Sequence, residues 1–366
     1  MKILLIGFSK IKYMPYINFY FDNLSAEEHE LHVLYWNRDL KAESLDEFKR
    51  VTIHEFAESQ RDDVAKLSKI KNFLKYRKYA KKLIRKENFD FIIFLHSLPG
   101  VLLSGLLRRR YKGRYIFDYR DLTYEGFSPY RKVIHSLVRH SCATFVSSDG
   151  FRPFLPLDCV DKIHTSHNFM ADSLHHRGTG GKDFVTVPCI RVAFWGFIRD
   201  ERINLLLIDR LGNDCRFELH YYGRESRVTQ NLQNHASTIG AKGVFFHGEY
   251  TPAERYDFAK KTEIIHNMFS DKNMMVAMSN KYYDGAIFHI PQLCMPGSVM
   301  GQNAEKAGIG FSCDPSQEDF ADQVYDYYKA LDPQRFATAC DKELSRILEE
   351  YEHGCEVIRQ AVSAKL

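Results

Sequence analysis

Glycines followed by cationic side chains occur where an apolar run of strand length ends in the second half of the sequence. The first example is Gly196, with Arg199 and Arg202 shortly after it, ahead of a helical pattern. A guanidinium fork fits phosphate oxygens, and a helix N-terminus adds partial positive charge, so this segment has the composition of a phosphate-binding turn. Pairing of the two arginines with Asp200 and Glu201 in a solvated turn is an equally good interpretation.

Two later apolar runs end in a similar way. Tyr222 and Gly223 follow one run, and Gly248 and Tyr250 follow the next. Aromatic and polar side chains beside a glycine suit contacts with a base or a sugar. Glycine after a strand is also common in ordinary turns, so each of these signals is weak on its own.

A cation and a carboxylate share one helical turn further along the chain. Lys281 and Asp284 are three residues apart, which places them on one helix face, with Asn280 and Tyr283 beside them. An ammonium group there would hold a diphosphate, and an ionised carboxylate would accept hydrogen bonds from sugar or ribose hydroxyls. The competing interpretation is a surface ion pair that contributes little.

The first half of the chain offers an acid–base group. His96 follows one apolar run, and Asp118, Arg120 and Asp121 follow the next. If the two strands are neighbours, a histidine and two carboxylates around an arginine would activate or orient a hydroxyl. A single histidine at a strand end is more often structural. The carboxylates are the stronger candidates, because charges beside an apolar strand need a reason.

Gly7 and Phe8 directly follow the first apolar run. A glycine there lets the backbone approach a ligand or a neighbouring loop. The three-glycine dinucleotide fingerprint is absent, so no dinucleotide is predicted, and a tight turn is at least as good an interpretation.

Apolar runs of strand length alternate with helical patterns along the whole chain, which predicts βα units and parallel sheets. We expect an α/β fold of two doubly wound, Rossmann-like domains that face each other across a cleft. The predicted strands are 2–6, 31–36, 51–56, 89–95, 115–117, 143–147, 163–165, 191–195, 216–222, 244–247, 263–266, 290–294 and 310–312. The predicted helices are 64–87, 129–140, 204–211, 252–260, 280–287, 301–307, 318–331 and 334–364.

A polar, glycine-rich stretch divides the two series of elements. We predict a first domain over residues 1–175, a linker over 176–188 and a second domain over 189–345. The remaining residues, 346–366, read as a helix that crosses back to the first domain.

Composition narrows the class of protein. Among 366 residues, 45% are hydrophobic, 14% are aromatic and the net charge is +4, which is typical of a globular protein and too mild to indicate a nucleic-acid partner. The most apolar stretches are too short to span a membrane, and the first residues do not form a signal peptide. The eight cysteines lack zinc-site spacing, so we expect reduced thiols, no metal and a cytoplasmic location.

The stretch Lys69–Lys86 is strongly basic, with apolar residues near helical spacing. A basic amphipathic helix suits an anionic membrane surface, which would make the protein peripheral on the inner face of the membrane. The competing interpretation packs the apolar stripe against the sheet and leaves the cations in water. No nucleic-acid motif accompanies the charge.

The order and spacing of these segments resemble family 4 glycosyltransferases of the GT-B fold. The main match is the stretch Asn280-Lys281-Tyr282-Tyr283-Asp284-Gly285-Ala286-Ile287-Phe288-His289-Ile290-Pro291. Further matches are the segments 194–199, 247–248, 263–269 and 301–315. In the first half, 118–121 looks like the D-x-R-D of bacterial polysaccharide members, and 143–149 and 167–169 match two further family segments.

The resemblance implies transfer of a sugar, with retention of configuration, from a nucleotide diphosphate sugar to a hydroxyl of a lipid-linked glycan in surface polysaccharide synthesis. Together with the strand-end residues above, it leads us to predict a donor site of eleven residues, the catalytic residues Asp118, His96 and Arg120, and an acceptor side with Gly7, Phe8 and Asp121. The resemblance also implies that no cofactor or metal is needed. The donor residues are Gly196, Arg199, Arg202, Tyr222, Gly223, Gly248, Tyr250, Asn280, Lys281, Tyr283 and Asp284.

Two alternatives remain open. One is a nucleotide-sugar epimerase of the same fold, and the other is an inactive member that binds a nucleotide sugar or acts as a scaffold. The family often carries two glutamates eight residues apart, whereas this chain has Val276 and Asp284 at those places. Release of nucleoside diphosphate from a donor distinguishes an enzyme from an inactive binder.

Overall fold

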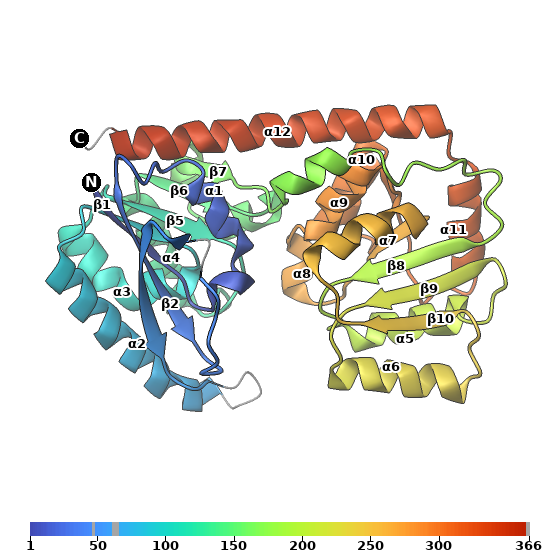
Figure 1. Cartoon of the computed structure of the whole chain (residues 1–366), viewed down its shortest axis with the longest axis horizontal. Helices are drawn as coiled ribbons and strands as arrows, with labels where there is room; N and C mark the ends of the chain where they lie inside the picture. Colours follow the sequence, from blue (N-terminus) through green and yellow to red (C-terminus); the bar gives the residue numbers. More distant parts are fainter. Residues whose placement is uncertain (46–47, 61–65, 364–366) are drawn as a thin grey trace. The chain divides into compact units, whose positions relative to one another are not determined.

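The computed structural model describes residues 1–45, 48–60 and 66–363, and it divides the chain into two compact units. The first unit comprises Met1–His167 with Glu350–Leu366, and the second comprises Asn168–Glu349. Each unit is built on its own parallel sheet with helices on the faces (Figure 1), so the prediction of two Rossmann-like α/β domains is confirmed. The segment predicted as a linker, 176–188, lies inside the second unit.

The first unit holds a seven-stranded parallel sheet in the order β3-β2-β1-β4-β5-β6-β7. Its central strands are buried on both faces, which explains why they are apolar at consecutive positions. Every predicted strand of this half is present. The strands are β1 (Lys2–Ile6), β2 (Glu30–Asn37), β3 (Val51–Ala57), β4 (Phe91–Phe94), β5 (Tyr115–Tyr119), β6 (Ala143–Val146) and β7 (Ile163–Thr165).

Helices connect these strands, and two of them, the short α1 (Asn18–Phe21) and the longer α3, were not predicted. The helix α3 (Ser97–Arg110) is apolar on most sides and contains Pro99 and two glycines. It therefore lacks the 3.6-residue periodicity of apolar residues that is typical of a surface helix. The predicted helix 64–87 is α2, although its first two residues lie outside the described residues. The other elements are α1 (Asn18–Phe21), α2 (Lys66–Glu87), α4 (Ser128–His140) and the 3₁₀ turns η1 (Ile11–Tyr13), η2 (Pro15–Ile17), η4 (Asp149–Phe154) and η5 (Leu157–Lys162).

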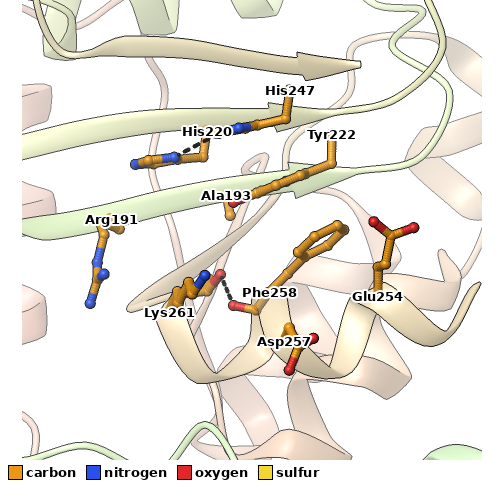
Figure 2. Close-up of a pocket in the computed structure, with 10 residues that line it drawn as sticks. Arg191, Ala193, His220, Tyr222, His247, Glu254, Asp257, Phe258 and Lys261 are labelled. Carbon is orange, nitrogen blue, oxygen red and sulfur yellow. Dashed lines mark hydrogen bonds between the residues drawn. The ribbon is translucent and has the colours of Figure 1, made fainter. Parts of the chain in front are cut away.

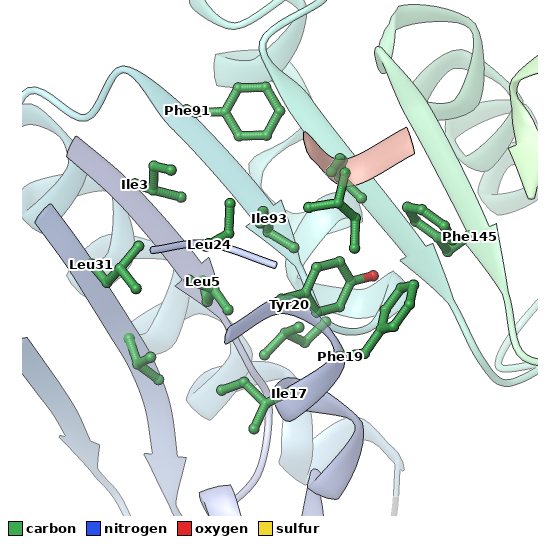
Figure 3. Close-up of a cluster of buried hydrophobic side chains, with 14 of the residues drawn as sticks. Ile3, Leu5, Ile17, Phe19, Tyr20, Leu24, Leu31, Phe91, Ile93 and Phe145 are labelled. Carbon is green, nitrogen blue, oxygen red and sulfur yellow. The ribbon is translucent and has the colours of Figure 1, made fainter. Parts of the chain in front are cut away.

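One face of the first sheet packs against aromatic residues from α1 and against the end of the last helix. Figure 3 shows Ile3 and Leu5 of β1 facing Tyr20, with Phe145 of β6 beside them. Cys355 belongs to the same buried cluster and comes from α12 (Pro333–Ser363). The chain therefore returns to its first unit through this helix, because the helix completes the apolar core there.

The second unit holds a six-stranded parallel sheet in the order β10-β9-β8-β11-β12-β13. All six predicted strands are present, and each keeps its predicted place in the chain. They are β8 (Ile190–Trp195), β9 (Phe217–Tyr222), β10 (Val244–Gly248), β11 (Ile264–Asn267), β12 (Gln292–Cys294) and β13 (Gly310–Ser312).

The helices of the second unit begin at polar residues that cap them. Asp200, Ser226 and Ser279 each accept a backbone N–H of the first turn. The helix after Ser226 was not predicted, because its sequence is polar over most of its length. The elements are η6 (Ala171–His176), α5 (Glu201–Leu211), α6 (Arg227–Thr238), η7 (Pro252–Glu254), α7 (Arg255–Lys261), α8 (Lys272–Val276), α9 (Asn280–Phe288), α10 (Val299–Ala307) and α11 (Phe320–Lys329).

No helix within the described ranges is long and apolar enough to cross a membrane. In the helix α2, Tyr76, Ala80 and Ile84 are fully buried, so the apolar stripe packs inward as the competing interpretation held. Ile70 and Leu74 remain about half exposed on the same helix, among its cations.

Candidate functional site

Three glycines form the turns at the carboxyl edge of the second sheet. Gly196 donates its backbone N–H to Tyr222, and Gly223 donates to Gly248, at 2.9 and 2.7 Å. Gly196 and Gly248 have φ values of 133° and 81°, which favour glycine. A Cβ on Gly223 would lie 2.2 Å from the Gly196 carbonyl oxygen. The three predicted glycines are therefore brought together, and the close approach of their backbones requires glycine.

Arg199 and Arg202 are exposed just before and inside the first turn of α5. Their acidic neighbours are engaged elsewhere. Asp200 caps α5 and accepts the backbone N–H and hydroxyl of Ser270, and Glu201 accepts from Asn231. The arrangement leaves both guanidinium groups at a helix N-terminus, as the phosphate-binding interpretation predicts.

Lys281 is the most unusual cation of this edge. Its side chain is only 6% exposed, and its Nζ lies 4.1 Å from the centre of the Phe194 ring and 5.1 Å from that of Phe269. A Cβ on Gly196 would be 4.0 Å from this nitrogen. Burial lowers the pKa of Lys281 to about 7, helped by Arg199. An anion placed beside the Gly196 turn would raise that pKa again, so the geometry suits an anionic ligand.

Asp284 is also buried, but it is committed to protein partners. Its carboxylate accepts from Trp195 Nε1 at 2.8 Å and from the Arg255 guanidinium at 3.2 Å. Burial raises the pKa of Asp284, opposed by Arg255. The predicted contact of this carboxylate with a ligand hydroxyl therefore competes with two internal partners, and the predicted surface ion pair with Lys281 is absent from the described contacts.

Arg255 was missed by the sequence analysis. It begins α7, is 6% exposed, and joins Asp284, the Pro252 carbonyl and Ser173. No local motif marks it, since its partners are distant in sequence. The sequence signal that could have indicated Arg255 is an arginine near the start of one predicted helix and an aspartate on the next predicted helix along the chain.

The remaining predicted donor residues surround the same edge. Asn280 accepts from Asn168 at 2.5 Å, and the Tyr283 ring is buried 6.2 Å from that of Phe169. Tyr222 stacks against other rings on the sheet face, and burial raises the pKa of Tyr250 to about 12. Most of these side chains support the turns and the helix rather than project into solvent.

The acidic group of the first unit is more deeply buried than predicted. The strand β5 extends to Tyr119, so Asp118 lies inside the strand and not at its end, and it is fully buried. It accepts from the Tyr20 hydroxyl at 2.7 Å and from Arg120 Nε at 2.8 Å. Arg120 also donates to Ser166. Burial raises the pKa of Asp118, opposed by Arg120.

Two buried atoms of this pair have no hydrogen-bond partner among the described residues. They are Asp118 Oδ1 and Arg120 Nη1, an acceptor and a donor. Such atoms are costly in a dry interior. A water molecule or a ligand hydroxyl would satisfy both types of group.

His96 is the more accessible member of the predicted catalytic set. It caps α3 by accepting the Leu98 N–H at its Nδ1, and its Nε2 lies 3.7 Å from Asp121. Because Nδ1 acts as an acceptor, the neutral ring carries its proton on Nε2. In this arrangement the Nε2 of His96 is a donor, and the ring has no free lone pair with which to accept a proton.

Gly7 and Phe8 are structural in the described chain. A Cβ on Gly7 would lie 2.4 Å from the end of the Met14 side chain, and its carbonyl accepts from the Tyr76 hydroxyl. Phe8 is 5% exposed and packs among Trp36 and other rings, with His96 stacked at 6.3 Å. These two residues support the loop beside His96.

Comparison with known proteins gives similar structures but no similar family. No family model and no curated protein matches the sequence. The solved structures that resemble the chain include Anabaena HepE in complex with UDP and glucose, with a TM-score of 0.66 and 12% identity over 100% of this chain and 98% of that one.

Two further structures cover the whole of both chains. They are sucrose-phosphate synthase from Thermosynechococcus elongatus, with a TM-score of 0.73 and 11% identity, and the lipopolysaccharide outer core galactosyltransferase WaaB, with a TM-score of 0.66 and 12% identity. At such low identity the likeness is one of architecture. The chain has the GT-B fold, with one Rossmann-like sheet in each of its two units.

Proposed function

We propose that the protein is a retaining glycosyltransferase that moves a sugar from a nucleotide diphosphate sugar to a hydroxyl of a lipid-linked glycan in surface polysaccharide synthesis. One observation carries the donor half of this proposal. Lys281 presents a buried ammonium group that has no ion-pair partner among the described residues, and it lies beside the Gly196 turn and Arg199. A diphosphate supplies the negative charge that this site lacks.

The similar structures support the same ligand class. HepE was solved with UDP and with UDP-glucose, and WaaB is a galactosyltransferase of the lipopolysaccharide outer core. Sequence similarity to these proteins is low, so the support comes from the fold together with the cationic edge of the second sheet. The sugar, the base and the linkage are not part of the proposal.

In the first unit we assign positioning roles. Asp118 holds Arg120, and a bound water would satisfy the unpaired Arg120 Nη1 and Asp118 Oδ1. His96 donates from Nε2 and orients a ligand oxygen, with Asp121 beside it. This division of roles follows from burial, because a fully buried carboxylate is poorly placed to contact a large acceptor.

A lipid-linked acceptor requires access to a membrane surface. The helix α2 carries a groove lined by Leu74, Arg77, Lys78, Lys81, Lys82 and Arg85. Burial lowers the pKa of Lys81, and the neighbouring charges of Arg77, Arg85 and Arg109 act in the same direction. Closely spaced cations with exposed Ile70 and Leu74 suit an anionic lipid surface.

A nucleotide-sugar-binding protein without transfer is the second candidate. The observation that favours it is the burial of Asp118, since a general base must reach the acceptor hydroxyl. Release of nucleoside diphosphate from a nucleotide sugar in the presence of acceptor separates the two candidates.

Replacing Lys281 by Met should weaken binding of UDP about tenfold or more, because a charge-assisted contact is lost. In the unaltered protein, Lys281 loses its proton as the pH rises through about 7, so UDP affinity should fall between pH 7 and 9. Lys281→Arg keeps its charge and should remove this pH dependence. Isothermal titration calorimetry measures each affinity.

The matched control for this experiment is Lys272→Met, which removes an exposed cation of the same unit. It should bind UDP as the unaltered protein does. Affinity within twofold of the unaltered protein in Lys281→Met would remove Lys281 from the donor site.

Asp118→Asn should lower the melting temperature and the turnover together, while leaving UDP affinity unchanged. The substitution removes the charge that balances buried Arg120, and breaking a buried pair costs about 3–5 kcal/mol. Differential scanning fluorimetry, turnover and calorimetry on one variant give the three values. Loss of turnover at an unchanged melting temperature would instead assign Asp118 a direct role at the acceptor hydroxyl.

Transfer should need no added divalent metal, because the cationic groups of the second unit are available to neutralise the diphosphate. The measurement is turnover before and after dialysis against EDTA, using the nucleotide sugar that stabilises the protein most in a thermal-shift panel. Activity that disappears and returns only with Mg²⁺ or Mn²⁺ would contradict this.

The double variant Lys78→Glu, Lys82→Glu should reduce binding to vesicles that contain phosphatidylglycerol, since each basic residue near such a surface is worth about 1 kcal/mol. The control is Lys260→Glu, Lys306→Glu, with the same charge change in the second unit. Sedimentation with vesicles measures the bound fraction. Equal losses in both variants, or equal binding to neutral vesicles, would remove α2 from the membrane proposal.

A further inference from the structure

A cavity of about 380 Å³ lies between α7 and the face of the second sheet formed by β8, β9 and β10 (Figure 2). The sheet side has room because Ala193 is the small residue at the middle of β8. Lys281, Arg199 and the Gly196 turn do not belong to its lining, so the cavity is separate from the proposed diphosphate site. Its volume is within the usual range for small-molecule sites, about 300–1,000 Å³.

Basic side chains line one end of this cavity, and acidic side chains line the other. Figure 2 shows Arg191 and Lys261 on one side and Glu254 and Asp257 on the other. Arg191 is held by Glu263 through two hydrogen bonds, of 2.8 and 2.9 Å. Lys261 is exposed, and it is close enough to His247 to lower the pKa of that ring, after burial and His220. Glu263 therefore balances the charge of Arg191, and Lys261 is the cation that this end offers to a ligand.

The other end offers acceptors for hydroxyl groups. Oε2 of Glu254 accepts from Thr251, which leaves its second carboxylate oxygen for a ligand. Asp257 is exposed and has a neighbouring lysine, Lys260, at 3.3 Å. Ionised carboxylates only accept hydrogen bonds, so this end suits a ligand that carries hydroxyls.

Stacked rings form the wall between the two ends. Tyr222 lies 3.8 Å from Phe258 and 4.3 Å from His247, with the ring planes within 18° of parallel. The His220 and His247 rings are connected by a hydrogen bond of 3.0 Å, and Glu218 accepts from His220. Because His220 donates to Glu218, it accepts from His247, and the Nδ1 of neutral His247 remains an acceptor.

The same histidine arrangement occurs in the first unit, where Glu30, His32 and His54 form an equivalent chain at the corresponding pair of strands. This hydrogen-bonded series of one glutamate and two histidines thus occurs in both sheets, and it does not by itself identify a binding site. What distinguishes the second unit is the cavity and the opposite charges at its two ends.

We propose that this cavity binds a hexose ring that carries an anionic group, with the anion at Lys261, the hydroxyls at Glu254 and Asp257, and the ring against Phe258. The anionic group is a carboxylate or a phosphate. A uronic acid residue of a glycan and a free sugar phosphate share this chemistry. The proposal does not depend on glycosyl transfer, since a binding site of this kind would exist in an inactive protein as well.

The test measures binding of D-glucuronate, glucose 6-phosphate and neutral D-glucose to the full chain with UDP added at a saturating concentration. Calorimetry gives each affinity, and the NMR signals of the His220 and His247 ring protons report occupancy of this cavity. We expect at least one anion to bind about tenfold more tightly than glucose and to shift both histidine signals. Preference between the two anions identifies the source of the ligand.

Lys261→Glu should weaken binding of the anion about tenfold, whereas Lys242→Glu, an equivalent change at an exposed lysine outside the cavity lining, should not. Asp257→Asn should weaken binding without removing the preference for an anion. Melting temperatures show whether each variant is folded. The proposal is overturned if glucose binds as tightly as the anions, if neither anion binds saturably, or if Lys242→Glu has the effect of Lys261→Glu.

Discussion

The Asp284 carboxylate accepts hydrogen bonds from Trp195 and Arg255, and these contacts determine the electrostatic environment at the carboxyl edge of the second sheet. Those three side chains come from β8, α7 and α9, so one buried carboxylate holds three elements in register. The Asp284 carboxylate faces Trp195 and Arg255, and no ion pair joins it to Lys281, although the two residues share a helix. The lysine is left buried between two aromatic rings, and burial lowers its pKa. Among the described residues only the nearby Asp284 charge opposes the lowering of the Lys281 pKa, so a buried ammonium group that is destabilising in the free protein becomes favourable once an anion binds beside it.

The first unit also contains a buried pair of an aspartate and an arginine, but two atoms of this pair have no hydrogen-bond partner among the described residues. Asp118 and Arg120 are in direct contact at 2.8 Å, and Tyr20 and Ser166 satisfy two more of their atoms. Removing both charges from water is expensive, and only a complete set of hydrogen bonds offsets the cost. Two of their atoms remain unpartnered, so this set is incomplete as the structure stands. Each unit, then, contains a buried Arg–Asp pair: within the first unit at the end of β5, and within the second between α7 and α9.

Most of the fold was predictable from the sequence, because strands buried on both faces must be apolar at consecutive positions. The same rule fails where a buried strand contains a polar residue. Asp118 was taken as the residue after a strand, whereas β5 continues past it and pairs Asp118 with Phe145. The helices α3 and α6 were missed for opposite reasons, since one is apolar on most sides and the other is polar over most of its length.

The candidate site was predictable as a list of residues but not as a set of contacts. The glycines and Arg199 follow from their places after strands, and Lys281 follows from its place in the first turn of a predicted helix. The structure brings Gly196, Arg199 and Lys281 close together. Arg255 does not, because its contact with Asp284 joins residues 29 positions apart and no local pattern encodes that distance. Burial is similarly invisible in the sequence, and the complete burial of Asp118 is the reason that we propose a positioning role for it in place of the predicted role as a base.

Alternation along β9 shows how one strand supplies two environments. Phe217, Leu219 and Tyr221 are buried in the core, whereas the residues between them, Glu218, His220 and Tyr222, are only partly buried. Successive side chains of a strand point to opposite faces, so the second set lies together beside the cavity under α7. Tyr222 ends this row, and its carbonyl accepts the N–H of Gly196. The ring that forms a wall of the cavity and the carbonyl that fixes the Gly196 turn therefore belong to the same residue.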